Sequence, residues 1–238
     1  MRRTFLTAEW RWLAMLNYRI DRQVLLPLVP AGTELDTWRG EAIVSVVGFR
    51  FLKTSVLGVP VPFHRNFDEV NLRFYVRRES GGSLRRGVVF IREVVPRWAI
   101  AALAQWTYNE PYVALPMKSE TGPTGARYAW EHAGRWNSIA VEVAGEPSPL
   151  VAGSEAEFIT EHYWGYTQQR DGGTVEYEVK HPPWRVWNAK AATLACDVRG
   201  FYGAAYAEAL TVPPCSAFLA EGSEIAVMSA RRIELQRI

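Results

Sequence analysis

Hydrophobic and polar residues alternate strictly along residues 69–76. Successive side chains of a β-strand point to opposite faces, so this pattern predicts a strand with two different faces. One face carries the apolar residues Val70, Leu72, Phe74 and Val76. The other carries Glu69, Asn71, Arg73 and Tyr75. The carboxylate, the amide and the guanidinium therefore follow one another at steps of about 7 Å along one side of the strand.

Similar runs elsewhere in the chain predict further strands. The expected strands are 33–38, 41–51, 67–78, 84–95 and 174–181. Gly-containing turns separate them: Arg39–Gly40 joins the first two into a hairpin, the segment SGGS precedes residue 84, and Gly172–Gly173 precede residue 174. A loop is expected over 53–66, which is rich in Gly and Pro.

Two segments have helical periodicity instead. Pro96 suits the first turn of a helix over 98–106, where large and small apolar residues recur at four-residue spacing. Ser154 and Glu157 form a capping box that predicts a helix over 154–170. His162 lies on the apolar stripe of that second helix, which favours a hydrogen-bonded core histidine over a catalytic one.

The predicted fold class is α+β and mainly β, an antiparallel β-barrel or cone with a few flanking helices. No repeat, low-complexity tract or long linker divides the chain, so we expect one domain over residues 1–238.

The composition narrows the classes of function. A formal charge of +2 with scattered basic pairs gives no nucleic-acid interface. Cys196 and Cys215 are too few for a disulfide scaffold, and neither they nor the four histidines have the spacing of metal ligands, so no metal and no cofactor is expected. No apolar run reaches the roughly 18 residues of a membrane helix. Glu9 and Arg11 interrupt the segment after MRRTFL that an export signal would need, so we predict a cytoplasmic protein.

Aromatic residues make up 13% of the chain, with ten Trp, which suits either a tight core or an apolar pocket. Three sets of residues are candidates for chemistry. The face with Glu69, Asn71 and Arg73 either lines a barrel interior, where buried charges mark a binding site, or is the wet side of a sheet. His181 is either a general acid or base or a structural residue packed on Trp184.

Lys118 is the third candidate, as an amine that attacks carbonyl groups. Such an amine needs burial or a neighbouring cation to lower its pKa. Lys118 enters the polar turn Ser119–Pro123 and has no basic neighbour in sequence, which favours a solvated charge.

A family resemblance rests on several segments in register: VLLPLVPAGTELDTWRGEAIVSVVGF, FDEVNLRFYV, NEPYVALPM, FITEHYWGY and VKHPPWRVW. Over about residues 5–195 the chain resembles the YqjF-like family of uncharacterised bacterial proteins, a branch of the acetoacetate decarboxylase-like superfamily. The resemblance implies a β-rich, cone-like barrel that encloses a pocket. In the decarboxylases a lysine captures the keto group as a Schiff base, a second lysine lowers its pKa, and a strand glutamate shapes the carboxylate end.

Glu69 matches the strand glutamate of that superfamily. The residues that precede its two lysines align with Asn109–Glu110–Pro111, so the lysine positions fall on Tyr112 and Val113. Neither side chain forms an imine, and the resemblance therefore implies a protein without Schiff-base decarboxylation.

Three functions follow as hypotheses. The first is a barrel that binds a small, anionic organic ligand. The second is an enzyme that acts on a small keto or hydroxy acid by general acid–base chemistry. The third is a non-catalytic protein that forms homo-oligomers. The predicted site residues are Glu69, Tyr112 and His181 for catalysis, and Asn71, Arg73, Glu110 and Trp184 for ligand binding.

Overall fold

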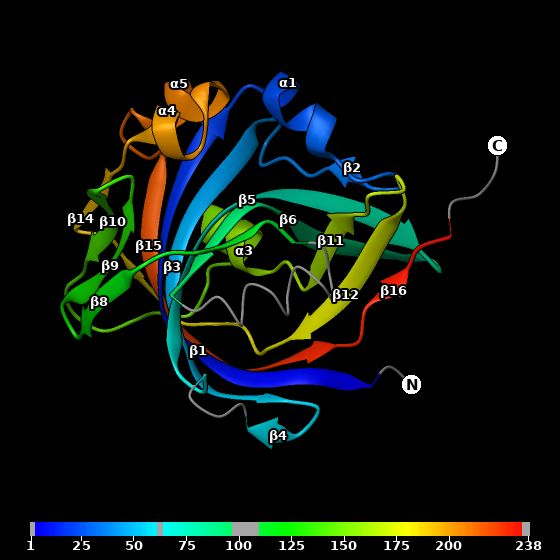
Figure 1. Ribbon diagram of the computed structural model, residues 1–238, viewed down its shortest axis with the longest axis horizontal. Helices are drawn as coiled ribbons and strands as arrows, with labels where there is room; N and C mark the ends of the chain where they lie inside the picture. Colours follow the sequence, from blue (N-terminus) through cyan, green and yellow to red (C-terminus); the bar gives the residue numbers. More distant parts are fainter. Residues whose placement is uncertain (1–2, 61–63, 97–109, 235–238) are drawn as a thin grey trace.

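The computed structural model describes residues 3–60, 64–96 and 110–234, and in this part of the chain seven strands form a closed ring (Figure 1). Their order around the ring is β15 (Ser216–Met228), β1 (Thr4–Ile20), β3 (Ala42–Val56), β5 (Phe67–Ser80), β6 (Ser83–Val95), β11 (Trp164–Gln168) and β12 (Thr174–Lys180). Val179 of β12 pairs with Val227 of β15 and so closes the ring.

Short strands extend this sheet at its margins. They are β2 (Glu34–Leu35), β4 (Val59–Pro60), β7 (Tyr112–Ala114), β13 (Val186–Asn188) and β16 (Arg231–Arg232). The prediction of a mainly β fold is confirmed. Its antiparallel character needs one correction, because β6 pairs in parallel with both β7 and β11. Parallel neighbours require a long connection, and here residues 96–163 separate β6 from β11.

A second sheet covers part of the outside of the ring (Figure 1). It consists of β8 (Met117–Gly122), β9 (Gly125–His132), β10 (Arg135–Glu142) and β14 (Ala191–Ala195). The buried side chains Tyr128, Trp130 and Ile139 pack against the outer face of the ring. The approach is closest at Gly48 of β3, where a Cβ would stand 2.6 Å from Tyr128 Cδ2. The apolar face of β5 lies in this layer, so both faces of β5 are buried.

The helices are short: α1 (Arg22–Leu25), α3 (Glu155–Thr160), α4 (Val198–Phe201) and α5 (Ala207–Leu210), with 3-10 turns at Leu26–Leu28 and Ala204–Tyr206. Helices α1, α4 and α5 gather at one end of the molecule (Figure 1). Among the described residues, no helix has the length and apolar character to span a membrane. The helix predicted over 98–106 lies outside the described residues.

The helix predicted over 154–170 is wrong in its second half. Its start is correct, because the Ser154 hydroxyl accepts from the Glu157 amide and the Glu157 carboxylate accepts from the Gly153 amide. The helix ends at Thr160, and residues 164–168 form β11 between β6 and β12. Aromatic and β-branched residues favour a strand there, and the pairing with both neighbours outweighs the helical spacing.

The hairpin predicted over 33–51 exists only at its turn. Arg39 and Gly40 have positive φ angles of 51° and 88°, and Trp38 pairs with Glu41. Residues 34–35, however, pair with β5 instead of β3. Strand β3 also runs on to Val56 and turns at residues 57–58 into β4, so much of the loop predicted over 53–66 is a second hairpin.

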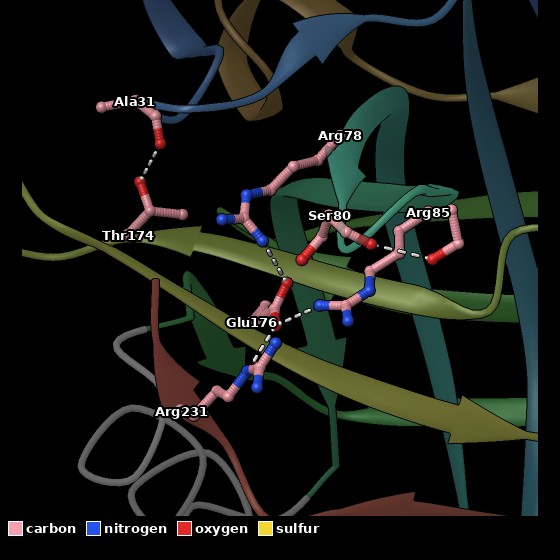
Figure 2. A network of polar contacts seen from close by, with 8 residues as sticks. Ala31, Arg78, Ser80, Arg85, Thr174, Glu176 and Arg231 are labelled. Carbon is pink, nitrogen blue, oxygen red and sulfur yellow. Dashed lines mark hydrogen bonds and ion pairs between the residues drawn. The ribbon is translucent and has the colours of Figure 1, made fainter. Parts of the chain in front are cut away.

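An ion cluster holds the ring together where β12 meets β16. Figure 2 shows the guanidinium groups of Arg78, Arg85 and Arg231 around Glu176, whose side chain is fully buried. The N···O distances are 3.4, 2.7 and 2.6 Å respectively. Burial alone would raise the pKa of Glu176, but the arginines outweigh it and hold the pKa below its ordinary value. One carboxylate thus ties β5, β6 and β16 to β12.

Candidate functional site

A cavity of about 140 Å³ lies inside the ring, and all seven ring strands contribute to its wall. Most of the wall is apolar. The aromatic side chains that line it include Trp10, Phe49, Phe51, Phe67, Phe90, Trp164 and Trp184. Polar side chains of the wall gather on β5, on β6 and in and before β7. Four more polar side chains lie elsewhere in the wall: Thr160, His162, Tyr177 and His181. Such a concave apolar site with a few converging polar groups is typical of a small-molecule site.

The polar face of β5 looks into the cavity. Glu69, Asn71 and Arg73 all line it, and Glu69 and Asn71 are almost completely buried. Asn71 Nδ2 donates a hydrogen bond of 3.0 Å to Glu69 Oε1. The hydroxyl of Tyr112 donates to Glu69 Oε2 over 3.1 Å. Four of the residues predicted from the sequence therefore lie together on one side of the cavity.

A second carboxyl group, that of Glu93, joins them from β6. Glu93 stands opposite Asn71 in the register of the two strands. The register shifts at Ile91, because Leu72 faces Arg92 whereas Arg73 faces Phe90. This β-bulge inserts one residue and so turns Glu93 to the cavity side, where Phe90 also lies.

Glu110 supplies the third carboxyl group from the segment before β7. A hydrogen bond of 3.1 Å from the Glu93 amide to the Pro111 carbonyl fixes this segment beside β6. Glu110 accepts a short hydrogen bond from Tyr177 and one of 3.4 Å from Thr167. The charge of its carboxyl group also acts on that of Glu93. In the described part of the chain, no group of three or more His, Cys, Asp or Glu side chains is placed to hold a metal ion.

The three carboxyl groups hold their protons more tightly than ordinary glutamates. Burial raises the pKa of Glu69 to about 7, against the opposing hydrogen bonds from Asn71 and Tyr112. Burial likewise raises the pKa of Glu110 to about 7. The pKa of Glu93 is raised well above its ordinary value by burial and by the charges of the other two carboxylates. Near neutral pH the cluster therefore carries protons that it can give or take.

Arg73 faces the same cavity but pairs with none of these carboxylates. Among the described residues it forms no ion pair, and its Nε is buried without a hydrogen-bond acceptor. Its Cζ lies 5.8 Å from the centroid of the Tyr75 ring. A guanidinium with unused donors can take a carboxylate in a two-pronged hydrogen bond.

His162 lies at the cavity wall and not only in the core. Its Nε2 is 3.3 Å from Asp36 Oδ2, and the same oxygen accepts from Arg86 over 2.8 Å. Nδ1 is buried without a partner among the described residues, so the expectation of a fully hydrogen-bonded histidine is wrong for this nitrogen. Burial lowers the pKa of His162 to about 4, which makes it neutral at physiological pH.

His181 and Trp184 line another part of the wall. Their rings stack with centroids 4.1 Å apart, and Tyr163 lies on the His181 ring at 4.6 Å. His181 Nδ1 is 2.9 Å from the carbonyl of Pro182, and Trp184 donates to Ser223 Oγ over 2.9 Å. Burial lowers the pKa of His181. The packing expected against Trp184 is present, and the ring still borders the cavity.

Comparison with known proteins agrees with this architecture. The sequence profile of the family DUF2071, described as "Uncharacterized conserved protein (COG2071)", matches residues 7–224. The chain belongs to the DUF2071 family. It is 28% identical to the uncharacterized protein YqjF of Bacillus subtilis over 201 residues, which cover 82% of this chain and 80% of that protein.

Solved structures that resemble this DUF2071 protein are acetoacetate decarboxylase-like. The acetoacetate decarboxylase of Legionella pneumophila superposes with a TM-score of 0.69 at 12% identity, over 98% of this chain and 88% of that one. The enduracididine biosynthesis enzyme MppR, in a complex with pyruvate, superposes with a TM-score of 0.66 at 14% identity, over 98% and 91%. At these identities the likeness shows the fold, and the predicted acetoacetate decarboxylase-like fold is confirmed.

The lysines of this DUF2071 protein lie away from the cavity. All four lie in the described part of the chain, are exposed, and are absent from the cavity wall: Lys53, Lys118, Lys180 and Lys190. Lys118 lies on β8 of the second sheet, with its ammonium nitrogen 4.0 Å from the centroid of the Trp136 ring. Tyr112, at the position where the family resemblance places a lysine, lines the cavity instead.

Several residues of the site in this DUF2071 chain escape prediction from the sequence. Strand periodicity identifies Glu93 and Tyr177 only as parts of strands, and Asp36 only as part of a hairpin. A sequence signal exists for Glu93, which stands directly before Val94 and Val95 in the run VVFIREVV, since a carboxylate in so apolar a strand is rarely buried without a purpose. No comparable signal marks Asp36, because its partners are distant in the sequence.

Proposed function

We propose that this protein binds a small organic acid in the cavity of the ring, without forming a Schiff base. The observation that carries the proposal is Arg73, a guanidinium without an ion pair among the described residues, in a wall that is mostly apolar and aromatic. The ligand's carboxylate accepts hydrogen bonds from Arg73. A second polar group of the ligand lies against Glu69 and Tyr112.

The volume of the cavity limits the size of the acid. An engineered cavity of about 150 Å³ in a protein core accommodates benzene. A cavity of about 140 Å³ therefore suits a ligand of comparable bulk, with the aromatic side chains around its apolar part. The solved structure of MppR with pyruvate supports this assignment, because it is an example of a protein of this fold that holds a small keto acid.

The test is a titration of short aliphatic and aromatic carboxylic acids. Trp10, Trp164 and Trp184 line the cavity, so intrinsic fluorescence reports binding, and calorimetry gives the affinity. For any acid that binds the wild type, Arg73→Gln should weaken the binding free energy by roughly 2 kcal/mol, which is about 30-fold in Kd. Arg77→Gln is the matched control, since Arg77 is an exposed neighbour on β5 that pairs with Glu34. Equal affinities in the two folded variants would refute the proposal.

A second proposal is that Glu69 acts as a general base on a bound keto or hydroxy acid. It is supported by the raised pKa of Glu69, about 7, and by its hydrogen bond to Tyr112. A base with a pKa near the working pH is most effective, and such a group contributes about 10²–10⁴-fold to a rate.

Proton exchange in D₂O tests this chemistry directly. Nuclear magnetic resonance would follow the loss of signal from the protons next to the carbonyl of a bound keto acid. Glu69→Gln should slow the exchange by about 10²–10⁴-fold, and Arg77→Gln should leave it unchanged. Exchange at the wild-type rate in Glu69→Gln would exclude Glu69 as the base.

The formation of homo-oligomers remains a prediction. Sedimentation of the purified protein would test it.

A further inference from the structure

Two oxygen atoms in the cavity wall accept no hydrogen bond from any described residue. They are Asn71 Oδ1 and Glu93 Oε2, and both residues are only 1% exposed. The orientation of the Asn71 amide is fixed, because its Nδ2 donates to Glu69. Its oxygen must therefore face away from Glu69. Leaving a buried acceptor without a donor is unfavourable, so a bound group that supplies donors would be stabilised at this place.

The two oxygens come from residues that stand directly opposite each other on β5 and β6. Opposite residues of an antiparallel pair have Cβ atoms about 4.5–5.5 Å apart and point to the same side. One donor group placed between the side chains can thus reach both oxygens. A primary ammonium carries three N–H donors and no acceptor, so it suits such a pair.

The charges nearby favour a cation at the same place. The carboxyl groups of Glu69 and Glu110 interact electrostatically with that of Glu93, and no lysine lines the cavity to neutralise them. Near neutral pH these carboxyl groups hold protons, and a bound ammonium can take the place of a proton in compensating their charge.

The opposite charge lies further along the same strand face. Arg73 is two residues beyond Asn71, a step of about 7 Å along β5. The cavity therefore offers acceptors at one point and a guanidinium at the next. A ligand that carries an ammonium and a carboxylate a few bonds apart matches both.

We infer that the ligand of the cavity is a small amino acid, whose ammonium donates to Asn71 Oδ1 and Glu93 Oε2 while its carboxylate accepts from Arg73. The inference deepens the proposed function and rests on it. The aromatic wall surrounds the side chain of the amino acid. The alternative donor to the two oxygens is a water molecule. In that case the amine of the ligand would add nothing to its affinity.

Matched ligands separate these cases in calorimetry on the full chain. The first set is leucine, 4-methylpentanoate, which lacks the amine, and 3-methylbutylamine, which lacks the carboxylate. The second set is phenylalanine, 3-phenylpropanoate and 2-phenylethylamine, and the third is valine, 3-methylbutanoate and 2-methylpropylamine. In the set that binds, we expect the amino acid to bind at least tenfold more tightly than either partial ligand.

Two variants test where the amine binds. Glu93→Met removes the acceptor and should abolish the tenfold preference for the amino acid over the plain acid. Arg77→Gln changes an exposed side chain of β5 outside the cavity wall and should retain the preference, which makes it the matched control. Thermal unfolding of both variants verifies that they fold. The comparison of ligands on the wild-type protein remains decisive if Glu93→Met does not fold.

The outcomes distinguish the inference from the function on which it rests. If the plain acid binds as tightly as the amino acid, the inference is wrong and the proposed function stands. The inference is also wrong, and the proposed function still stands, if Glu93→Met folds and keeps the preference. If only the amine binds, or if no ligand of any set binds, the proposed function fails together with the inference.

Discussion

Tyr177 reaches across Gly165 to donate its hydroxyl hydrogen to Glu110. Tyr177 and Gly165 are opposite each other on β12 and β11. A Cβ on Gly165 would stand 2.1 Å from Tyr177 Cζ, far inside van der Waals contact. The missing side chain of Gly165 therefore allows the Tyr177 ring to pass over this residue and its hydroxyl to hold the carboxyl group of Glu110.

Gly165→Ala should consequently destabilise the protein and displace Tyr177 from Glu110. Overpacking of this kind costs about 1–3 kcal/mol in the free energy of unfolding, which urea titration measures. Gly122→Ala is the control, because no atom lies within 4 Å of a Cβ built there and its φ is not in the left-handed region. Equal stability of the two variants would show that Tyr177 does not need the space.

The carboxyl cluster makes a prediction about pH. Glu69 has a pKa of about 7 in the folded protein and an ordinary value of 4.5, so the folded state binds the proton more tightly. Between pH 4.5 and 7 the folded state holds more protons than the unfolded state, and the free energy of unfolding falls as the pH rises. A single carboxyl group with this shift lowers the free energy of unfolding by roughly 3 kcal/mol when the pH reaches 7.

The variant Glu69→Gln removes this contribution together with the effect of the Glu69 charge on Glu93, which has the same sign. His162 acts in the opposite direction over about the same window, because its pKa is lowered to about 4, but it titrates in both proteins and cancels in their difference. The stability of Glu69→Gln relative to the wild type should rise as the pH increases from 4.5 to 7. Urea titrations at several pH values measure it, and a difference independent of pH would contradict the raised pKa.

The cluster at Glu176 predicts a large loss of stability. Glu176→Gln leaves Arg78, Arg85 and Arg231 without their shared carboxylate at the seam of the ring (Figure 2). Removing one partner of a buried ion pair costs up to about 5 kcal/mol, and partial exposure of the arginines reduces this to roughly 3 kcal/mol. Glu34→Gln, which removes the exposed partner of Arg77, should change stability by less than about 1 kcal/mol. Similar urea midpoints for the two variants would show that the ion cluster at Glu176 does not stabilise the ring.

Sequence patterns locate β5 and its two faces because both faces follow a strict alternation of period two. They do not place Glu93, because the bulge at Ile91 interrupts the alternation of β6 and is set by pairing with β5. They also extend the helix from Ser154 too far, since the residues after Thr160 form a strand only when β6 and β12 lie beside them. Glu110 reaches the cavity through a contact between Glu93 and Pro111 that no local pattern encodes. Local periodicity thus predicts faces, and tertiary pairing decides which carboxylates meet.

Because no lysine lines the cavity, we predict that carbonyl compounds form no stoichiometric imine with this protein. We expect no stoichiometric adduct in the intact mass after incubation with pyruvate, other small keto acids or aldehydes and reduction with borohydride. An imine forms when an amine lies beside the carbonyl carbon of a bound compound, and none of the four lysines lines the cavity. Lys118→Ala is the control, and its mass spectrum should match that of the wild type apart from the substitution itself. A single adduct on the wild type that is absent from Lys118→Ala would make Lys118 a nucleophile in spite of its place on the second sheet.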